Sequence, residues 1–472
     1  MKTVKGRDGM KKFLSVILAL AAVLTLSACA KTADGGDKNN SSSYKPDDIA
    51  LKSENFTITR AEVSYIFYQN YNEFVNTQPD SVDMYNIDTN SSLKGQEYHD
   101  GISWFRYFAD ATLDYMKYVL VFCEAARADG LELDEEDKAS VDEAVQSYYD
   151  YAEKYDYDVQ ELFTKTFNSD VTPQVLRAYL EKDALAHKYY YKLIDSYEHT
   201  DDELSAFVEE NPYKFYSIDY ISYTFDEDFD SNAKESAAAL ASISDTEEFK
   251  KYIEDYASDI KTDTVLNIED CIVRYAARNE YSEFSVWAFD GAKAGETYTA
   301  ANELEGTYTV YLLTSAPSLQ EYKTRDFRFI KEYVSGHDSF QETMNFVNGL
   351  LEKWKAGEAS EESFAALAKE YNRLSDDELG GGLYLNAAKS DTSLPQTAID
   401  WLFAEDTEPG DTTVVKGDAC YMALYYIGED EVQWKFLAKQ GLSEKKYLED
   451  YEKYSEKYPV TVDNDVVDSL EA

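Results

Sequence analysis

The spacing of apolar residues changes once along the chain, close to residue 216. Between about 60 and 210, apolar side chains recur every three or four positions, which is typical of amphipathic helices. Thr59-Arg60-Ala61-Glu62 and Thr200-Asp201-Asp202-Glu203 are capping boxes, and Thr172-Pro173 has the pattern of an N-cap followed by the first helical residue. We therefore predict short strands at Ile49–Leu51 and Phe56–Ile58, followed by helices from residues 60, 173 and 201 and over about 102–128 and 135–154.

From residue 216 onward, strand-like segments alternate with helical ones, and the same order occurs twice. Each copy begins with a segment rich in Tyr, Phe and Ile, at Tyr216 and at Thr324, and continues with two helical stretches. The later parts also correspond: Trp287, Phe289 and Gly295 of the first copy match Trp401, Phe403 and Gly410 of the second. The pattern predicts two tandem β-α-α-β-α-β units.

Three of the 20 glycines, Gly380, Gly381 and Gly382, stand together between a helical stretch and the apolar segment Leu383–Leu385. Glycine adopts positive φ at little steric cost. We expect this run to turn the backbone sharply as it leaves a helix and returns to a sheet.

The N-terminus has the pattern of an export signal. Five basic residues before residue 13 precede the apolar run Phe13–Leu26, which is too short to span a bilayer as a helix. Leu26-Ser27-Ala28-Cys29 resembles a bacterial lipobox, which predicts lipidation of Cys29 and anchoring at the extracytoplasmic face of the cell membrane. Ordinary secretory cleavage near Ala28 is the alternative, and it would give a free soluble protein. The polar stretch that follows is typical of a flexible tether.

The strong negative charge of the chain makes some classes of binding partner unfavourable. The formal net charge is −47, and removal of the first 28 residues, which carry net +4 from four Lys, one Arg and one Asp, leaves −51. Such a surface repels phosphate backbones, so we expect no nucleic-acid partner. Solubility is the simplest reason for the acidity, and steering of basic unfolded segments or loose binding of divalent cations are alternatives. The 41 tyrosines are typical of adaptable binding surfaces.

The cysteines and histidines predict no metal site. Apart from Cys29, the cysteines are far apart in sequence, which favours isolated buried thiols over a disulfide framework. The histidines have no ligand spacing, and we expect each to be exposed or satisfied at a helix cap. These residues are Cys123, Cys271 and Cys420, and His99, His187, His199 and His337.

The second copy resembles the parvulin-type peptidyl-prolyl isomerase domain. The residues that carry the resemblance are Phe364, Leu367, Ala368, Tyr371, Gly381, Leu383, Trp401, Phe403, Gly410 and Val414. The whole chain after Cys29 is similar to foldases of the PrsA/SurA type in the order of its parts.

This resemblance implies an α+β protein: a helical SurA-N-like chaperone domain and two tandem parvulin-like domains, each with a four-stranded antiparallel sheet. The implied boundaries are 1–28 signal peptide, 29–47 tether, 48–205 helical domain, 206–320 and 321–430 parvulin-like domains, and 431–472 tail. The resemblance also implies that the tail returns to the first domain, with Val460–Val462 pairing near Ile49–Ile58, whereas a frayed C-terminus is the alternative. It implies no cofactor.

Parvulins place two histidines and a Cys or Asp around the proline-binding pocket, and this chain departs from that pattern. The first-strand histidine position falls on Tyr220 in one copy and on Phe327 or Phe329 in the other, and the last-strand position falls on about Tyr308 and Tyr421. The Cys or Asp position has no clear match, although Asp376 and Asp377 precede the glycines. We expect Leu383, Trp401 and Phe403 to contact peptide, and any surviving catalysis to depend on the aromatic positions.

Two functions remain open at this point. In the first, the chain is an anchored chaperone that binds unfolded, newly exported proteins. In the second, it is an isomerase that accelerates rotation of their X-Pro bonds, which takes roughly 10–100 s without catalysis. A solute-binding or purely structural lipoprotein is a weaker third possibility, because the order of elements gives no two-lobed α/β pattern.

Overall fold

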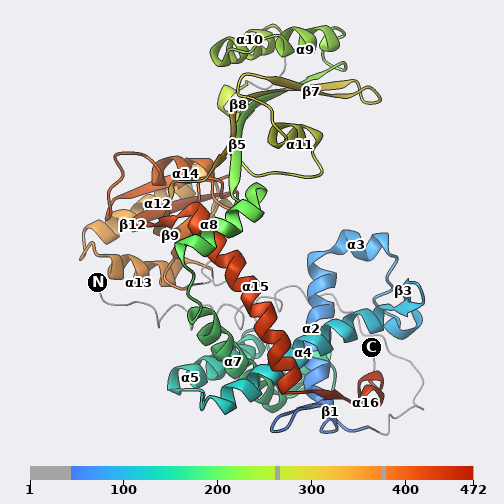
Figure 1. Cartoon of the computed structure of the whole chain (residues 1–472). Helices are drawn as coiled ribbons and strands as arrows, with labels where there is room; N and C mark the ends of the chain where they lie inside the picture. Colours follow the sequence, from blue (N-terminus) through green and yellow to red (C-terminus); the bar gives the residue numbers. More distant parts are fainter. Residues whose placement is uncertain (1–43, 261–265, 374–378, 471–472) are drawn as a thin grey trace. The chain divides into compact units, whose positions relative to one another are not determined.

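A computed structural model describes residues 44–260, 266–373 and 379–470 of the chain (Figure 1). The predicted signal peptide, Cys29, the first part of the tether, Asp376 and Asp377 lie outside these residues. The chain divides into two compact units. Unit 1 comprises residues up to 197, 372–382 and 444–472, and unit 2 comprises 198–371 and 383–443. The fold combines helices with several small antiparallel sheets, as expected for an α+β chain.

Unit 1 is mainly helical. Its helices are α2 (Arg60–Thr77), α3 (Pro79–Met84), α4 (Trp104–Ala128), α5 (Glu135–Lys154), α6 (Val159–Phe167), α7 (Pro173–Asp195), α16 (Asn464–Asp468) and the second half of α15 (Gln433–Lys457). The capping box predicted at Thr59 is present, and the Thr172 side chain caps α7. The helix predicted from residue 102 begins instead at Trp104, because Ile102–Ser103 forms strand β4, which pairs with β3 (Glu97–His99).

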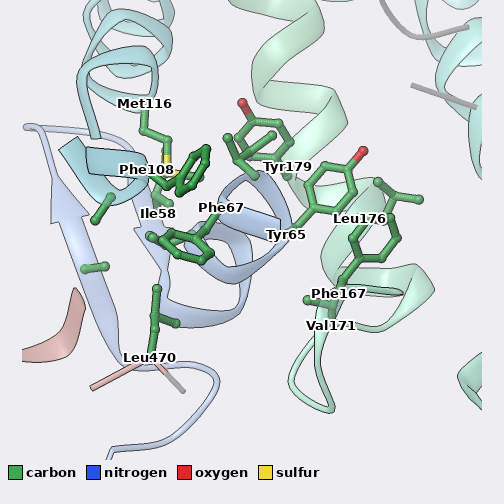
Figure 2. Close-up of a cluster of buried hydrophobic side chains, with 14 of the residues drawn as sticks. Ile58, Tyr65, Phe67, Phe108, Met116, Phe167, Val171, Leu176, Tyr179 and Leu470 are labelled. Atoms are coloured by element: carbon green, nitrogen blue, oxygen red, sulfur yellow. The ribbon is translucent and has the colours of Figure 1, made fainter. Parts of the chain in front are cut away.

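Many aromatic side chains contact one another in the core of unit 1 (Figure 2). Phe67 of α2 lies against Phe108 of α4, with ring centroids 6.2 Å apart. Tyr65, also on α2, contacts Phe167 and Tyr179, with centroid distances of 5.0 and 5.8 Å. Such pairs stabilise a core by about 0.5–1.5 kcal/mol each beyond the burial of their apolar area.

The C-terminal tail completes this core. Strand β13 (Thr461–Val462) pairs antiparallel with β1 (Ile49–Lys52), with Leu51 opposite Val462, and this is the pairing expected for the tail. β1 pairs in turn with β2 (Thr57–Thr59). Leu470 is fully buried in the same cluster as Phe67 (Figure 2). Burial of each such aliphatic side chain contributes about 1.5–3 kcal/mol, so the tail is part of the unit and not an appendage.

A row of tyrosines holds α15 against this unit. Tyr447, Tyr451 and Tyr454 are spaced four and three apart, which places them on one face of the helix, and Tyr458 follows directly after its last residue. They pack against Phe122 of α4 and Tyr189 of α7, and the hydroxyls of Tyr189 and Tyr454 are 3.0 Å apart.

Unit 2 begins with α8 (Asp201–Glu210), which carries the predicted capping box at Thr200. The first repeat follows as β5 (Tyr216–Asp226), α9 (Ala233–Ala241), α10 (Thr246–Asp259), β6 (Ile272–Ala276), α11 (Glu283–Phe289), β7 (Thr297–Asn302) and β8 (Thr307–Leu319). The second repeat comprises β9 (Lys323–Tyr333), α12 (Phe340–Lys355), α13 (Glu361–Tyr371), β10 (Leu383–Ala387), α14 (Gln396–Leu402), β11 (Thr412–Lys416) and β12 (Cys420–Val432).

The two repeats have the same strand order. The first sheet runs β6-β5-β8-β7 and the second runs β10-β9-β12-β11, and all neighbouring strands are antiparallel. Gly380, Gly381 and Gly382 have φ values of 74°, 65° and 64°, which is the left-handed conformation expected from the glycine run.

Candidate functional site: an aromatic face on the first repeat

The sheet of the first repeat has one closed face and one partly open face. On the closed face, α9 and α10 cover a cluster that includes Ile221, Phe225 and Leu312. The opposite face packs on α11, around Ile218, Phe284 and Leu313. α11 has seven residues, and half-buried aromatic side chains from β5, β7 and β8 lie beside it on this face.

Seven aromatic residues lie in the cluster on the α11 side, and we refer to five of them, whose rings contact one another, as the aromatic face. They are Tyr220, Phe284, Trp287, Tyr298 and Tyr311, contributed by β5, α11, β7 and β8. The rings of Phe284 and Tyr311 stack with centroids 4.0 Å apart and planes inclined by 12°. Tyr220 meets Phe284 edge-on at 4.8 Å, and Trp287 lies 5.4 Å from Tyr298. Phe284 is buried beneath the other four, which are half-buried.

The aromatic face is uncharged at neutral pH. Burial raises the pKa of Tyr220 and of Tyr311. Burial and a 3.0 Å hydrogen bond to Glu283 Oε2 raise the pKa of Tyr298. The hydroxyl groups therefore keep their protons, and the surface combines flat apolar rings with hydroxyl donors.

The corresponding cluster of the second repeat, around α14, has more buried members than the cluster on the α11 side. Phe327 is buried and stacks on Tyr384 at 4.9 Å, and Trp401 and Phe403 lie half-buried at the edge of the same cluster. The guanidinium of Arg325 lies 5.6 Å from the centre of the Phe403 ring and forms an ion pair of 3.1 Å with Glu429. The chain's own cation thus covers ring surface on this face.

Phe403 has a second cation beside it. The ammonium group of Lys389 lies 5.5 Å from the centre of the Phe403 ring, 5.4 Å from that of Tyr322 and 5.1 Å from that of Tyr275. It also donates a hydrogen bond of 3.0 Å to the Tyr275 hydroxyl. Phe403 is therefore engaged inside the molecule, whereas the rings of the first repeat's aromatic face mainly contact one another.

The residues singled out in the sequence fall on different faces. Tyr220 belongs to the aromatic face, but Tyr308 is buried on the α9 side, where its hydroxyl donates to Glu227 at 2.9 Å. Phe327 and Phe329 share the α14 cluster, whereas Tyr421 lies on the α12 side. Leu383 is half-buried on β10, opposite Arg328.

The sequence reasoning named only Tyr220 of the five rings as a site position and missed the other four, namely Phe284, Trp287, Tyr298 and Tyr311. The available signal was the two-residue alternation of β8. Val310 and Leu312 point with Tyr308 to one side, and Tyr311 points with Leu313 to the other.

The four histidines do not belong to the aromatic face. His99 is exposed, His199 Nε2 lies 2.9 Å from Ser443 Oγ, and His337 lies 3.3 Å from Glu332. His187 departs from the expectation of an exposed or capping histidine, because its side chain is only 11% exposed and its Nδ1 lies 3.4 Å from the Asp183 carboxylate. Burial disfavours the imidazolium, but the Asp183 charge outweighs this effect and raises the pKa of His187.

A repeated aspartate also escaped the sequence reasoning. Asp219 Oδ1 accepts a hydrogen bond of 2.7 Å from the backbone amide of Tyr275, and Asp326 Oδ1 accepts one of 2.8 Å from that of Asn386. Tyr275 and Asn386 have φ values of 55° and 56°, which are rare for residues other than glycine. Both hydrogen bonds join the first strand of a repeat to the neighbouring edge strand. They fix the edge strand at the residue that has a positive φ.

Cys123, Cys271 and Cys420 are buried thiols that form no disulfide with one another, as expected. Burial raises the pKa of the Cys123 and Cys271 thiols, which makes them poor nucleophiles. Over the described residues, no group of three or more His, Cys, Asp or Glu side chains is arranged to hold a metal ion. Within the same part of the chain, no helix is both long and apolar enough to cross a membrane.

No family model and no curated protein matches this sequence. Among solved structures, the foldase protein PrsA from Streptococcus pneumoniae is similar at 14% identity, with a TM-score of 0.22 and coverage of 61% of this chain and 92% of that one. A structure from work on the SurA-like chaperones PEB4 and Cj1289 of Campylobacter jejuni is similar at 14% identity, with a TM-score of 0.16 and coverage of 66% and 96%.

Proposed function

We propose that this chain is an extracytoplasmic folding factor that binds unfolded segments of exported proteins and is anchored to the membrane through a lipid on Cys29. The observation that carries the proposal is the aromatic face, with three half-buried rings around the stacked pair of Phe284 and Tyr311. Half-buried rings offer contact area without loss of much side-chain freedom, and they accept many different apolar partners.

The chemistry of the aromatic face favours binding over catalysis. Its groups are rings and protonated hydroxyls, and His99, His187, His199 and His337 all lie elsewhere. The rate of X-Pro rotation rises when the amide is desolvated and polar groups are placed around its twisted form. Tyrosine hydroxyls are the groups on this face that could serve in that way, so an isomerase remains the second candidate.

Aggregation of a reduced, unfolded client protein tests the binding function. We expect the chain from Ala30 onward to suppress aggregation, and we expect the double variant Trp287→Ala and Tyr298→Ala to lose most of this effect. Phe229→Ala is the matched control, because Phe229 is a more exposed ring of the same repeat that lies outside the aromatic face. Equal suppression by the double variant and by the control would contradict the proposal.

A proline-limited refolding assay separates the two candidates. If the chain only binds its client, it leaves the rate of the slow refolding phase unchanged while it still suppresses aggregation. An accelerated slow phase that is lost in Tyr220→Phe and Tyr311→Phe would favour the isomerase instead.

A further inference from the structure

A second aromatic surface lies on unit 1, in the segment that joins α2 to α4. Residues 79–103 form α3, a short 3-10 turn at Leu93–Gly95, and the β3–β4 hairpin. Figure 1 shows α3 and β3 at the end of α2 that is remote from β1. The rings that gather here, which we call the hairpin patch, are Tyr85, Tyr98, His99, Trp104 and Tyr107.

Tyr98 is the centre of the hairpin patch. Its ring centroid lies 4.4 Å from that of His99, 4.5 Å from Trp104, 4.7 Å from Tyr107 and 6.1 Å from Tyr85. Tyr85 is 46% exposed and Tyr107 is 40% exposed, and Met84 and Ile102 add exposed aliphatic surface on the same elements. A cluster of exposed rings and aliphatic groups of this kind marks an interaction surface.

The hairpin patch rests on a firm base. Trp104 is buried in the unit 1 core and stacks with Phe108. Its backbone amide donates to the Gln96 carbonyl at 2.9 Å, and the Gln96 side chain accepts from the Asp88 amide at 2.8 Å and donates to the Asp88 carbonyl at 2.9 Å. The exposed rings of Tyr85 and Tyr107 therefore lie beside a segment that hydrogen bonds hold in place.

The surroundings of the hairpin patch are acidic. Between residues 79 and 114 there are seven carboxylates and two cations, Lys94 and Arg106. Lys94 donates to the Asp468 carbonyl at 2.7 Å, and Arg106 pairs with Asp110 at 2.5 Å and with Asp468 at 3.5 Å. Both cations are thus engaged inside the chain. The carboxylates are Asp80, Asp83, Asp88, Glu97, Asp100, Asp110 and Asp114.

Two other exposed tyrosines of unit 1, Tyr155 and Tyr157, differ in one respect. The ammonium groups of Lys154 and Lys165 lie 5.2 and 5.4 Å from the ring centres of Tyr155 and Tyr157. By contrast, among the described residues no lysine or arginine lies over the rings of Tyr85, Tyr98 or Tyr107. These rings, with carboxylates around them, are suited to receive a cation from outside the chain.

We propose that the hairpin patch docks polypeptide segments in which Lys or Arg stands next to aromatic or aliphatic residues. This inference rests on the proposed function and names the client segments that unit 1 selects. Ring faces attract the cation, the carboxylates attract it over a longer range, and the neighbouring apolar residues cover Met84 and Ile102. A second copy of the chain is a poor occupant, because each copy carries the same strongly negative charge.

Fluorescence anisotropy with two unstructured peptides tests the proposal on the chain from Ala30 onward. One peptide alternates Lys with Phe and Leu, and the other has Gln at every Lys position. We expect Tyr85→Ser with Tyr107→Ser to weaken binding of the Lys peptide about 5- to 30-fold and to leave the Gln peptide nearly unchanged. The matched control is Tyr155→Ser with Tyr157→Ser, since these rings are 49% and 41% exposed and already lie beside lysines.

Charge gives an independent readout that does not remove rings. We expect replacement of Asp80, Asp83, Glu97 and Asp100 by their amides to weaken binding of the Lys peptide at low salt. The affinity should then also depend less on salt concentration. If both the ring variant and the charge variant bind the Lys peptide with unchanged affinity, the proposed docking site is wrong. It is also wrong if the ring variant changes the oligomeric mass of the protein and this change accounts for the weaker binding. If the unmodified chain binds neither peptide, the proposed function fails first, and the two failures are therefore distinguishable.

Discussion

Asp326 accepts a hydrogen bond of 2.8 Å from the backbone amide of Asn386, across 60 residues of sequence. The bond joins β9 to β10 at the point where their register shifts, and Asn386 has a φ of 56°. Asp219 and Tyr275 repeat the arrangement between β5 and β6. A carboxylate in the first strand of each repeat therefore fixes the shape of the neighbouring edge strand.

Removal of this carboxylate should destabilise unit 2. We expect Asp326→Ala to lower the free energy of unfolding by about 1–3 kcal/mol, because the Asn386 amide loses its partner. Urea denaturation measures the change. Asp338→Ala, an exposed carboxylate in the same repeat, is the control and should shift stability by less than about 0.5 kcal/mol.

The backbone conformation at Asn386 gives a related expectation, in which two effects on the free energy of unfolding oppose each other. Asn386→Gly removes the left-handed strain but also the Thr324 contact to the Asn side chain. We expect a net change within about 1 kcal/mol, smaller than the loss in Asp326→Ala. A loss in Asn386→Gly as large as that in Asp326→Ala would show that the carboxylate is not the main constraint.

Arg60 connects the returned tail to the helices of unit 1. It is buried, donates to Ser469 Oγ and to the Ser469 carbonyl at 2.8 and 2.9 Å, and forms an ion pair with Asp170. Arg60→Ala leaves Asp170 and Ser469 without this partner and should cost about 3 kcal/mol in unfolding free energy. The smaller change Ser469→Ala should cost about 1 kcal/mol.

Deletion from residue 459 onward extends this test. The deletion removes β13 and the buried side chains Val466, Val467 and Leu470. We expect the thermal unfolding transition of the unit 1 helices, measured by circular dichroism, to move to lower temperature. If that transition is unaltered in both the deletion and Arg60→Ala, the tail does not complete the core.

His187 makes the stability of unit 1 depend on pH. Its folded-state pKa is raised above the usual value of 6.5, so the imidazolium stabilises the fold below about pH 6.5, and this contribution is lost as the pH rises through the folded-state pKa. We expect the stability difference between the unmodified chain and His187→Gln to be larger at pH 5.5 than at pH 8.5. A difference that is equal at both values would mean that the pair with Asp183 does not titrate as described.

The proposed membrane anchor depends on Cys29, which lies outside the residues that the structure describes, and a substitution at this position tests it. Cys29→Ser removes the thiol that would receive the lipid, so we expect the protein to leave the membrane fraction and appear in the soluble extracytoplasmic fraction. Immunoblotting of the two fractions measures this. Cys123→Ser is the control for loss of a thiol, and retention of Cys29→Ser at the membrane contradicts the anchor.

Local signals made part of this fold predictable. The caps at Thr59, Thr172 and Thr200 begin their helices where the sequence placed them, and the glycine run adopts positive φ. These features depend on residues within a few positions of one another. The tail strand was also foreseeable, but only from the family resemblance, because its partner β1 lies some 410 residues away, as Leu51 opposite Val462 shows.

The aromatic face could not be assembled from the sequence in the same way. Tyr308 and Tyr311 are three residues apart on β8, so they point to opposite faces of the sheet, and an error of one residue exchanges the core for the open side. Phe284 reaches this face only because α11 crosses it. The role of Asp219 was equally hidden, since its partner amide is 56 residues away.

Site-specific photo-cross-linking to an unfolded client protein locates the binding surface most directly. A photoreactive amino acid is placed at position 287 or 298 on the aromatic face, and at position 229 as the control on the same repeat. We predict strong client adducts from 287 and 298 and weak ones from 229, with competition by an unlabelled apolar peptide. Adducts that form mainly from position 229, or equally from all three positions, would contradict binding at the aromatic face.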